Sequence, residues 1–353
     1  MPMAGNNSKS VPSAGDRILF ASPSWIGDIL MALPAFIYLR RKHPAAELLV
    51  LAKPGPRQIW ELFGLADRIL EQEPGLAGSF RTAARLKSLG CRRAYIVPNS
   101  FRSALIAFLA RIPERIGFRG HWRRLLLSSI AERRRGEERC HQTCEILDLV
   151  AAPAELMPRM PPLTLDADMV SEVCERLDFT PESIGLVPGA ARGPSKCWPE
   201  EHYISLGRIL AEAGFTLAVF GAANERELCE RVAARIGDSA CSYAGRTTVA
   251  EWAALISACQ AVVANDSGGM HLAAALGVPL VAIYGITDPA KTGPLGDRCR
   301  VLQKSEIRAR RVPRESHLAR KCLESITPES VYSALCNMVA VTRNGDPESF
   351  DEH

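Results

Sequence analysis

The sequence has no long hydrophobic run, no disulfide framework and no strong excess of charge. No run approaches the roughly 18 apolar residues that a membrane span needs, and the segment before Asp16 has no apolar core like that of a signal peptide. The eleven cysteines include no C-x-x-C pair, which favours reduced thiols over disulfides. A formal net charge of +4 over 353 residues is too small to indicate nucleic-acid binding. We therefore expect a soluble, cytoplasmic protein that could still contact a membrane surface.

Two common catalytic motifs are also absent. No Gly-x-Gly-x-x-Gly follows a strand, and Phe220 to Ala223 is only a fragment of that dinucleotide-binding pattern. No Gly-x-Ser-x-Gly elbow marks an α/β hydrolase. Asp266 to Gly269 resembles the nucleophile segment of chymotrypsin-like proteases, but those chains are all-β, whereas an Ala-rich helix pattern follows here. These observations argue against a dehydrogenase and against a serine hydrolase.

Cys140, His141 and Cys144 have residue types that bind metals. No second pair of ligands lies near them in the sequence. We therefore favour buried or half-buried thiols on one helix face, and we expect no metal.

Short β-rich runs alternate with helical patterns from Arg17 onward, and the scheme occurs twice. The first half predicts strands over 18–21, 48–52, 94–98 and 115–118, and helices over 28–42, 79–89, 101–110 and 142–150. The second half predicts strands over 184–188, 216–220, 261–264 and 278–284, and helices over 199–213, 225–236, 249–258 and 268–276. Strands that alternate with helices predict parallel sheets with helices on both faces.

The two halves separate near 152–164, where four prolines cluster. The predicted fold class is α/β, with two facing Rossmann-like, doubly wound parallel-sheet domains and a C-terminal helix. We place the domains at 17–165 and 166–326, and a final helix at 327–342 that packs toward the N-terminal domain. The polar N-terminus (1–16) and the acidic tail (343–353) are expected to be disordered.

Two loops that follow strands of the second half suit a phosphate. The loop from Pro188 to Pro199 combines small residues with Arg192 and Lys196, although an exposed loop with solvated cations is the alternative. The turn from Asp266 to His271 leads directly into a helix, whose first N–H groups and dipole attract anions. Ligands of doubly wound sheets bind at the carboxyl ends of strands, which is where both loops lie.

The first half contains a carboxylate and a set of arginines that need an explanation. Asp28 follows the first strand, and it either caps a helix or acts as a general base for transfer to a hydroxyl. Ten arginines lie between residues 101 and 139, with no lysine. They indicate an anionic acceptor or a membrane surface, or they form a solvated face.

Several of these motifs together resemble the bacterial ADP-heptose:lipopolysaccharide heptosyltransferases of glycosyltransferase family 9, most closely the type II enzymes. The likeness covers about Arg17 to Val341. It rests on separated motifs that occur in the same order, at 23–28, 98–105, 117–120, 193–199 and 266–271.

The resemblance implies an inverting GT-B enzyme that moves L-glycero-D-manno-heptose from ADP-heptose to the first heptose of heptosyl-Kdo2-lipid A. It implies no cofactor, no required metal and peripheral contact with the cytoplasmic face of the inner membrane. We expect a monomer that binds no nucleic acid. Three alternatives stay open: a type I or III heptosyltransferase, a non-catalytic nucleotide-sugar binder, and a sugar-nucleotide epimerase of the same architecture.

The resemblance also implies roles for individual residues. Asp28 matches the general base and Lys196 matches the diphosphate-binding lysine, so both are predicted to be catalytic. The other predicted donor-binding residues are Ala191, Arg192, Glu225, Thr247, Asp266, Ser267, Gly268, Gly269 and His271. Glu225 is the predicted ribose ligand, with Glu227 as the competing choice. The predicted acceptor-binding residues are Trp25, Asn99, Ser100, Arg102 and Arg119. The basic stretch 308–321 does not align with the family.

Overall fold

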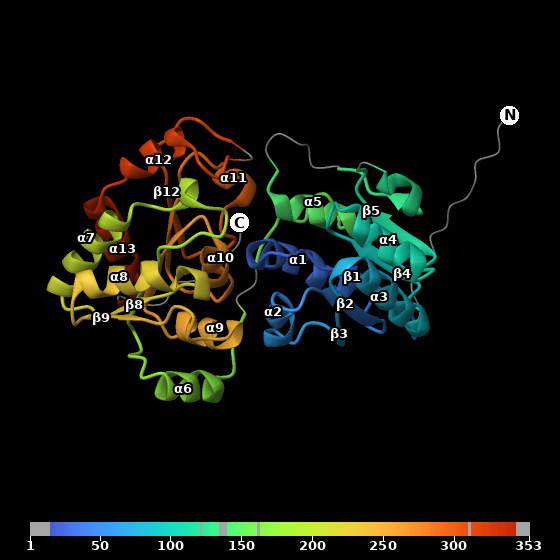
Figure 1. Cartoon of the computed structure of the whole chain (residues 1–353), viewed down its shortest axis with the longest axis horizontal. Helices are drawn as coiled ribbons and strands as arrows, with labels where there is room; N and C mark the ends of the chain where they lie inside the picture. The colour runs from blue at the N-terminus through green and yellow to red at the C-terminus, as the bar shows by residue number, and fades with distance from the viewer. Residues whose placement is uncertain (1–14, 121, 134–139, 161–162, 310–311, 344–353) are drawn as a thin grey trace, which may run out of the picture. The chain divides into compact units, whose positions relative to one another are not determined.

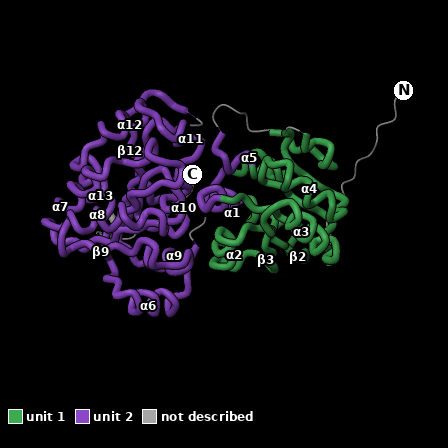
Figure 2. Tube along the Cα trace, in the orientation of Figure 1, with its two compact units in different colours: residues 1–24, 35–134, 146–156 green, residues 25–34, 135–145, 157–353 purple. Residues whose placement is uncertain are grey.

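The computed structural model describes residues 15–120, 122–133, 140–160, 163–309 and 312–343, and it divides into two compact units (Figures 1 and 2). Unit 1 comprises residues 1–24, 35–134 and 146–156, and unit 2 comprises residues 25–34, 135–145 and 157–353. The sequence predicts a single boundary at 165/166, whereas the contacts assign 25–34 and 135–145 to unit 2. The segments 1–16 and 343–353, expected to be disordered, lie outside the described residues except for 15, 16 and 343.

Unit 1 is built on a six-stranded parallel sheet with the strand order β3-β2-β1-β4-β5-β6. Its central strands are buried and nearly all apolar, as expected when helices cover both faces of a parallel sheet. The strands are β1 (Arg17–Ala21), β2 (Glu47–Ala52), β3 (Arg68–Glu71), β4 (Arg93–Ile96), β5 (Glu114–Gly117) and β6 (Ser129–Ile130).

The helices of unit 1 are α2 (Arg57–Leu62), α3 (Gly75–Leu89), α4 (Phe101–Leu109), η1 (Arg123–Leu126) and parts of α1 (Ile26–Lys42) and α5 (Gln142–Leu149). Phe20 of β1, Phe36 of α1 and Trp60 of α2 pack edge to face, with ring centroids 4.9–5.7 Å apart. The unit division falls inside α1, directly after Pro34.

Unit 2 contains a second six-stranded parallel sheet, with the order β12-β11-β10-β7-β8-β9. Counted from its first strand, this order repeats that of unit 1. The strands are β7 (Ile184–Val187), β8 (Leu217–Val219), β9 (Ala240–Ser242), β10 (Ala261–Asn265), β11 (Leu280–Ile283) and β12 (Cys299–Leu302). The α/β class and the two doubly wound sheets are thus confirmed.

The helices of unit 2 are α6 (Ala167–Arg176), η2 (Pro194–Lys196), α7 (Glu200–Glu212), η3 (Ala223–Glu225), α8 (Arg226–Ile236), α9 (Val249–Ser257), α10 (Gly268–Ala275), α11 (Pro289–Thr292), α12 (His317–Glu324) and α13 (Pro328–Arg343). Val331, Leu335 and Val339 of α13 belong to the core of unit 2. The predicted packing of this helix toward the N-terminal domain stays a prediction. No helix in the described ranges is long and apolar enough to cross a membrane.

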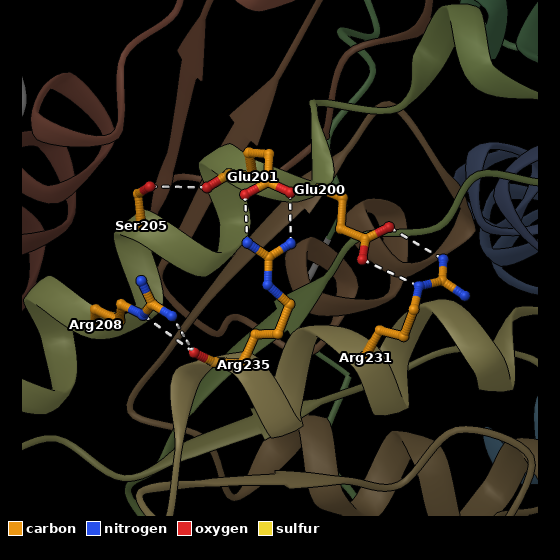
Figure 3. A network of polar contacts seen from close by, with 6 residues as sticks. All are labelled: Glu200, Glu201, Ser205, Arg208, Arg231 and Arg235. Atoms are coloured by element: carbon orange, nitrogen blue, oxygen red, sulfur yellow. Dashed lines mark hydrogen bonds and ion pairs between the residues drawn. The ribbon is translucent and has the colours of Figure 1, made fainter.

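Helices α7 and α8 are joined by a network of exposed ion pairs (Figure 3). Glu200 accepts two hydrogen bonds from Arg231, and Glu201 accepts two from Arg235. Arg208 donates to the backbone oxygen of Arg235. Exposed pairs contribute little individually, so this network orients α8 on α7 and is not a candidate site.

Candidate active site

Unit 2 has a topological switch point between β7 and β10, where the strand order reverses. The two strands pair in parallel, with Val187 opposite Ala264. Their carboxyl ends therefore lie side by side, which places the loop 188–199 next to the turn 265–271. Doubly wound sheets bind ligands at this position. The two loops that the sequence predicts to bind phosphate thus lie next to each other.

Lys196 and Asp266 form an almost buried ion pair across this switch point. Their side chains are 11% and 7% exposed. Removing one partner of such a pair leaves a buried, uncompensated charge. The ammonium of Lys196 has three N–H donors, so it can bind a phosphate oxygen while bonded to Asp266. Asp266 therefore fixes the position of the lysine, and its own negative charge does not suit direct contact with a diphosphate.

Asn265 is a buried residue that the sequence analysis did not select. Its side-chain amide donates to the backbone oxygen of Pro188 at 2.7 Å, and its Oδ1 accepts from Trp198 N at 3.0 Å and Tyr203 Oη at 3.1 Å. It therefore fixes both ends of the loop that carries Lys196. The signal for this role is a polar residue at the end of an otherwise apolar, buried strand, because a buried amide must find partners.

The turn after Asp266 supplies the N-terminus of α10. Ser267 occupies the N-cap, and its Oγ is buried without a hydrogen-bond partner in the described part of the chain. Gly269 lies against Val187 and Trp252. The first N–H groups of a helix and a buried hydroxyl suit an anionic oxygen.

His271 is buried in α10, and burial lowers its pKa to about 3. Its ring therefore stays neutral near pH 7. A Cβ added at Gly27 would lie 2.8 Å from Cδ2 of His271, so the ring packs against the first turn of α1. This contact places the predicted general base on the same unit as the predicted donor-binding turn.

Asp28 is half-buried in that first turn. Burial raises the pKa of its carboxyl above the ordinary value. The positive charge of Arg192 opposes this rise most, followed by a hydrogen bond from Gln142 and the charge of Lys196. A carboxylate whose pKa is raised toward neutrality is suited to accept a proton.

Glu225 is the last residue of η3, after β8, and its carboxylate lies against Gly189, which follows β7. One of its oxygens accepts a hydrogen bond from Ala222 N at 2.9 Å. A Cβ at position 189 would lie 2.2 Å from Oε1 of this carboxylate, so a side chain there would push the carboxylate away. Glu227 is exposed in the first turn of α8. The geometry thus favours Glu225 over Glu227 as the ribose ligand, which stays a prediction.

The remaining predicted donor residues lie on two surface loops. Ala191 and Arg192 are exposed in the loop after β7, and Thr247 is half-buried immediately before Thr248, the N-cap of α9.

The loop of Lys196 is attached to the basic stretch that did not align with the family. Ser195 is buried, and its Oγ lies 2.5 Å from the backbone oxygen of Pro313 and 3.0 Å from that of Arg314. Its backbone N–H also donates to Arg314 O at 3.3 Å. Gly193 has φ of +106° and lies against the Arg314 side chain. The described part of this stretch therefore supports the loop.

Four predicted acceptor residues belong to unit 1, whereas Trp25 belongs to unit 2 and is 55% exposed. Ser100 is the N-cap of α4 and accepts from Ser103 N at 3.2 Å. Arg102 donates to Ser79 Oγ at 2.8 Å and to the backbone oxygen of Glu73. Asn99 and Arg119 are exposed.

Among the described arginines of this run, at least three bind backbone oxygens within unit 1. They are Arg102, Arg115 and the fully buried Arg123, and burial lowers the pKa of Arg115 and Arg123. Arg133 lies 4.5 Å from the centre of the Phe118 ring, while positions 134, 135 and 139 lie outside the described residues. The charge run is therefore partly structural.

The segment with His141 does not resemble a metal site. His141 accepts from Thr143 N through Nδ1 at 3.2 Å, which leaves Nε2 to donate to Gly293 O at 3.0 Å. Burial lowers its pKa. Among the residues that the structure describes, no three His, Cys, Asp or Glu side chains are grouped so that they could hold a metal ion. Metal independence of the activity stays a prediction.

Comparisons with known proteins identify the family of the chain. The model of the family "Glycosyltransferase family 9 (heptosyltransferase)" matches residues 80–321. The chain is 32% identical to lipooligosaccharide heptosyltransferase 2 of Haemophilus ducreyi, covering 92% of this chain and 99% of that protein. It is 33% identical to lipopolysaccharide heptosyltransferase 2 of Escherichia coli K12, covering 81% and 88%. The structure of the E. coli ADP-heptose LPS heptosyltransferase II superposes with a TM-score of 0.83 at 30% identity, over 93% of this chain and 99% of that chain.

Proposed function

The chain belongs to glycosyltransferase family 9, and from this premise we propose that it is an inverting heptosyltransferase of lipopolysaccharide synthesis. Its donor is ADP-L-glycero-D-manno-heptose, and its acceptor is the first heptose of heptosyl-Kdo2-lipid A. The relatives named heptosyltransferase 2 support heptosyl transfer to lipopolysaccharide. They support the type II acceptor over the acceptors of types I and III.

The observation that supports this mechanism is that a carboxylate and two cations occur in one unit. Asp28 is half-buried, and Arg192 and Lys196 act on it electrostatically. A displacement at an anomeric carbon needs a base on the side of the acceptor and positive charge on the side of the leaving diphosphate. We assign the first role to Asp28 and the second to Arg192 and Lys196.

The transfer proceeds in one in-line step. The acceptor hydroxyl oxygen attacks the anomeric carbon, its proton passes to Asp28, and the bond to the diphosphate oxygen breaks with release of ADP. Lys196, held by Asp266, and the first amides of α10 stabilise the charge on the departing diphosphate. One displacement inverts the configuration at the anomeric carbon. With these donors present we propose that the reaction needs no metal.

The other residues hold the two substrates. Glu225 binds the ribose, and Ala191, Arg192, Thr247, Ser267, Gly268, Gly269 and His271 line the donor site. Exposed Asn99, Ser100, Arg119 and Trp25 contact the acceptor. Arg102 supports α3 and α4 through its bonds to Ser79 and Glu73. A monomer that contacts the inner membrane peripherally, on its cytoplasmic face, fits a lipid-anchored acceptor.

The direct test is incubation of the purified protein with ADP-heptose and heptosyl-Kdo2-lipid A. We expect release of ADP and a product heavier by one heptose, measured by mass spectrometry, with inverted configuration by NMR and unchanged rate in EDTA. Kdo2-lipid A, which lacks the first heptose, is the matched control. Transfer to that control alone contradicts the type II assignment.

The role of Asp28 is tested by Asp28→Asn, which keeps the shape of the side chain and removes the base. We expect transfer to fall by about 10²–10⁴-fold, while ADP binding by calorimetry is retained. Near-normal turnover of this variant would remove Asp28 from the mechanism.

A further inference from the structure

The segment His141–Gln142–Thr143 is anchored at two points of unit 2. His141 donates from Nε2 to Gly293 O at 3.0 Å, beyond the end of α11. Thr143 donates from Oγ1 to the backbone oxygen of Met31 in α1, at 2.8 Å. Both anchoring residues are buried. The residue between them is therefore held at a defined position beside the first turns of α1.

Gln142, the first residue of α5, uses this position to reach Asp28. Its Nε2 donates to Asp28 Oδ1 at 3.1 Å. An amide N–H can only donate here, and it cannot take the proton of the carboxyl. The bond therefore favours the charged form of Asp28, against the burial that favours the neutral form.

We propose that Gln142 is a positioning residue for transfer, which orients the Asp28 carboxylate and keeps it ionised at working pH. This inference rests on the proposed role of Asp28 as base. Through Gln142, the anchors of His141 and Thr143 set the direction of the free carboxylate oxygen. Nothing in the spacing of the sequence indicates this, because Gln142 lies 114 positions from Asp28.

Other charged groups act on the same carboxylate and have to be separated from Gln142. Arg192 and Lys196 both favour its charged form. His271 packs near Gly27, and His141 precedes Gln142, but the pKa of each ring lies below the ordinary value for histidine. Neither ring is altered in the Gln142 variants, so a change in the profile on altering Gln142 reports on Asp28.

The test is the pH dependence of transfer by the full chain carrying Gln142→Met, which keeps the length of the side chain and removes the donor. We expect kcat to fall about tenfold with KM for ADP-heptose within about twofold of wild type. We expect the acid limb of kcat/KM to move upward by about one pH unit, the effect of one hydrogen bond to a charged group. Gln142→Glu, which sets a second carboxyl beside Asp28, moves the limb further in the same direction.

Gln260→Met is the matched control. Gln260 immediately precedes β10, whereas Asp266 follows it, so it lies at the opposite end of that strand. The Gln260→Met variant loses the same kind of side-chain amide, and its pH profile of transfer should equal that of wild type. A fall in kcat for Gln142→Met without movement of the acid limb overturns the inference, because a merely structural residue gives that result.

The failure of this inference is distinguishable from the failure of the proposed function. If Asp28→Asn stays active, the base assignment falls whatever Gln142 does. If Asp28→Asn is inactive and the Gln142→Met profile superposes on that of wild type, Asp28 remains the base and only the role of Gln142 is wrong.

Discussion

The two units share one strand order, and each holds a cation at the carboxyl ends of its strands, but with different partners. In unit 2 the buried cation at this position, Lys196, is paired with the carboxylate of Asp266. In unit 1 the buried cation beside the ends of β4 and β5 is Arg123, which is fully buried. It donates to the backbone oxygen of Pro98 and, at 3.3 Å each, to Ile96 O and Asn99 Oδ1.

The partners of each cation explain the difference in use. Neutral carbonyl oxygens hold the side chain of Arg123 in place, so its role is structural. Gly117 and Gly120 lie directly against this side chain. Any larger residue at 117 would displace the guanidinium, which accounts for the glycines of the motif Gly117 to Gly120. Asp266, by contrast, fixes a lysine with only one of its three donors. One fold thus uses a buried cation for stability in unit 1, and in unit 2 we propose that it offers the cation to an anion.

The largest expected effect comes from breaking the pair of unit 2. Lys196→Met leaves the Asp266 carboxylate buried and uncompensated, which costs on the order of 3–5 kcal/mol of stability. It also removes charge stabilisation of the leaving diphosphate, so we expect turnover to fall by about 10²–10³-fold. Urea unfolding and steady-state kinetics measure the two effects.

The double variant Lys196→Met with Asp266→Asn separates stability from catalysis. It removes both charges, so stability should return to within about 1 kcal/mol of wild type while turnover stays low. Recovery of turnover in the double variant contradicts the role of Lys196 in charge stabilisation.

The matching change in unit 1 is Arg123→Ala. It leaves a cavity and strips several backbone oxygens of their donor, so we expect a loss of about 3 kcal/mol. Amide hydrogen exchange in β4 and β5 should accelerate, whereas that in β10 and the affinity for ADP should not change. Weakened ADP binding would show that this arginine has a role beyond unit 1.

The central sheet strands were predictable from the sequence, and the edge strands were not. All eight predicted strands are present, and the four that were missed, β3, β6, β9 and β12, are the four sheet edges. A central parallel strand is buried on both faces and reads as a continuous apolar run. Arg68–Glu71 and Cys299–Leu302 are short, carry charged residues and are partly exposed, so they lack that signal.

The site shows a similar limit. Lys196 and Asp266 could be predicted to lie together, because each follows a strand of the same sheet. Gln142 and Asn265 were missed because their roles depend on which distant groups approach them. Such an amide identifies itself only through its partners, and those lie 62 to 114 positions away.

A smaller effect concerns the pH dependence of stability in unit 2. The folded pKa of His271, about 3, lies below the ordinary value, so the unfolded chain binds its proton first as pH falls. Its contribution to stability is complete above pH 6.5, and about 2 kcal/mol is lost between pH 7 and pH 5. Asp28 acts in the opposite sense, because its raised pKa makes protonation stabilising.

The comparison of wild type with His271→Asn isolates this contribution, since His141 and His43 are present in both. The difference in unfolding free energy between the two should shrink by that amount from pH 7 to pH 5. A difference that does not vary with pH would mean that this ring is protonated alike in the folded and unfolded states.

The smallest expected effect comes from one serine in each unit. Each serine lies in the segment that follows the first strand of its unit. Ser195→Ala removes the hydroxyl that binds Pro313 O and keeps the backbone bond to Arg314 O, so we expect a loss of about 1 kcal/mol. Because Lys196 is the next residue, KM for ADP-heptose should rise a few-fold with kcat nearly unchanged.

In unit 1 Ser22 accepts a hydrogen bond from Trp60 Nε1 at 2.9 Å, in the core. Ser22→Ala should therefore destabilise unit 1 by a similar amount without changing that KM. If both variants raise KM equally, the loop attachment at Ser195 is not what positions Lys196, and the contrast between the two units fails at this point.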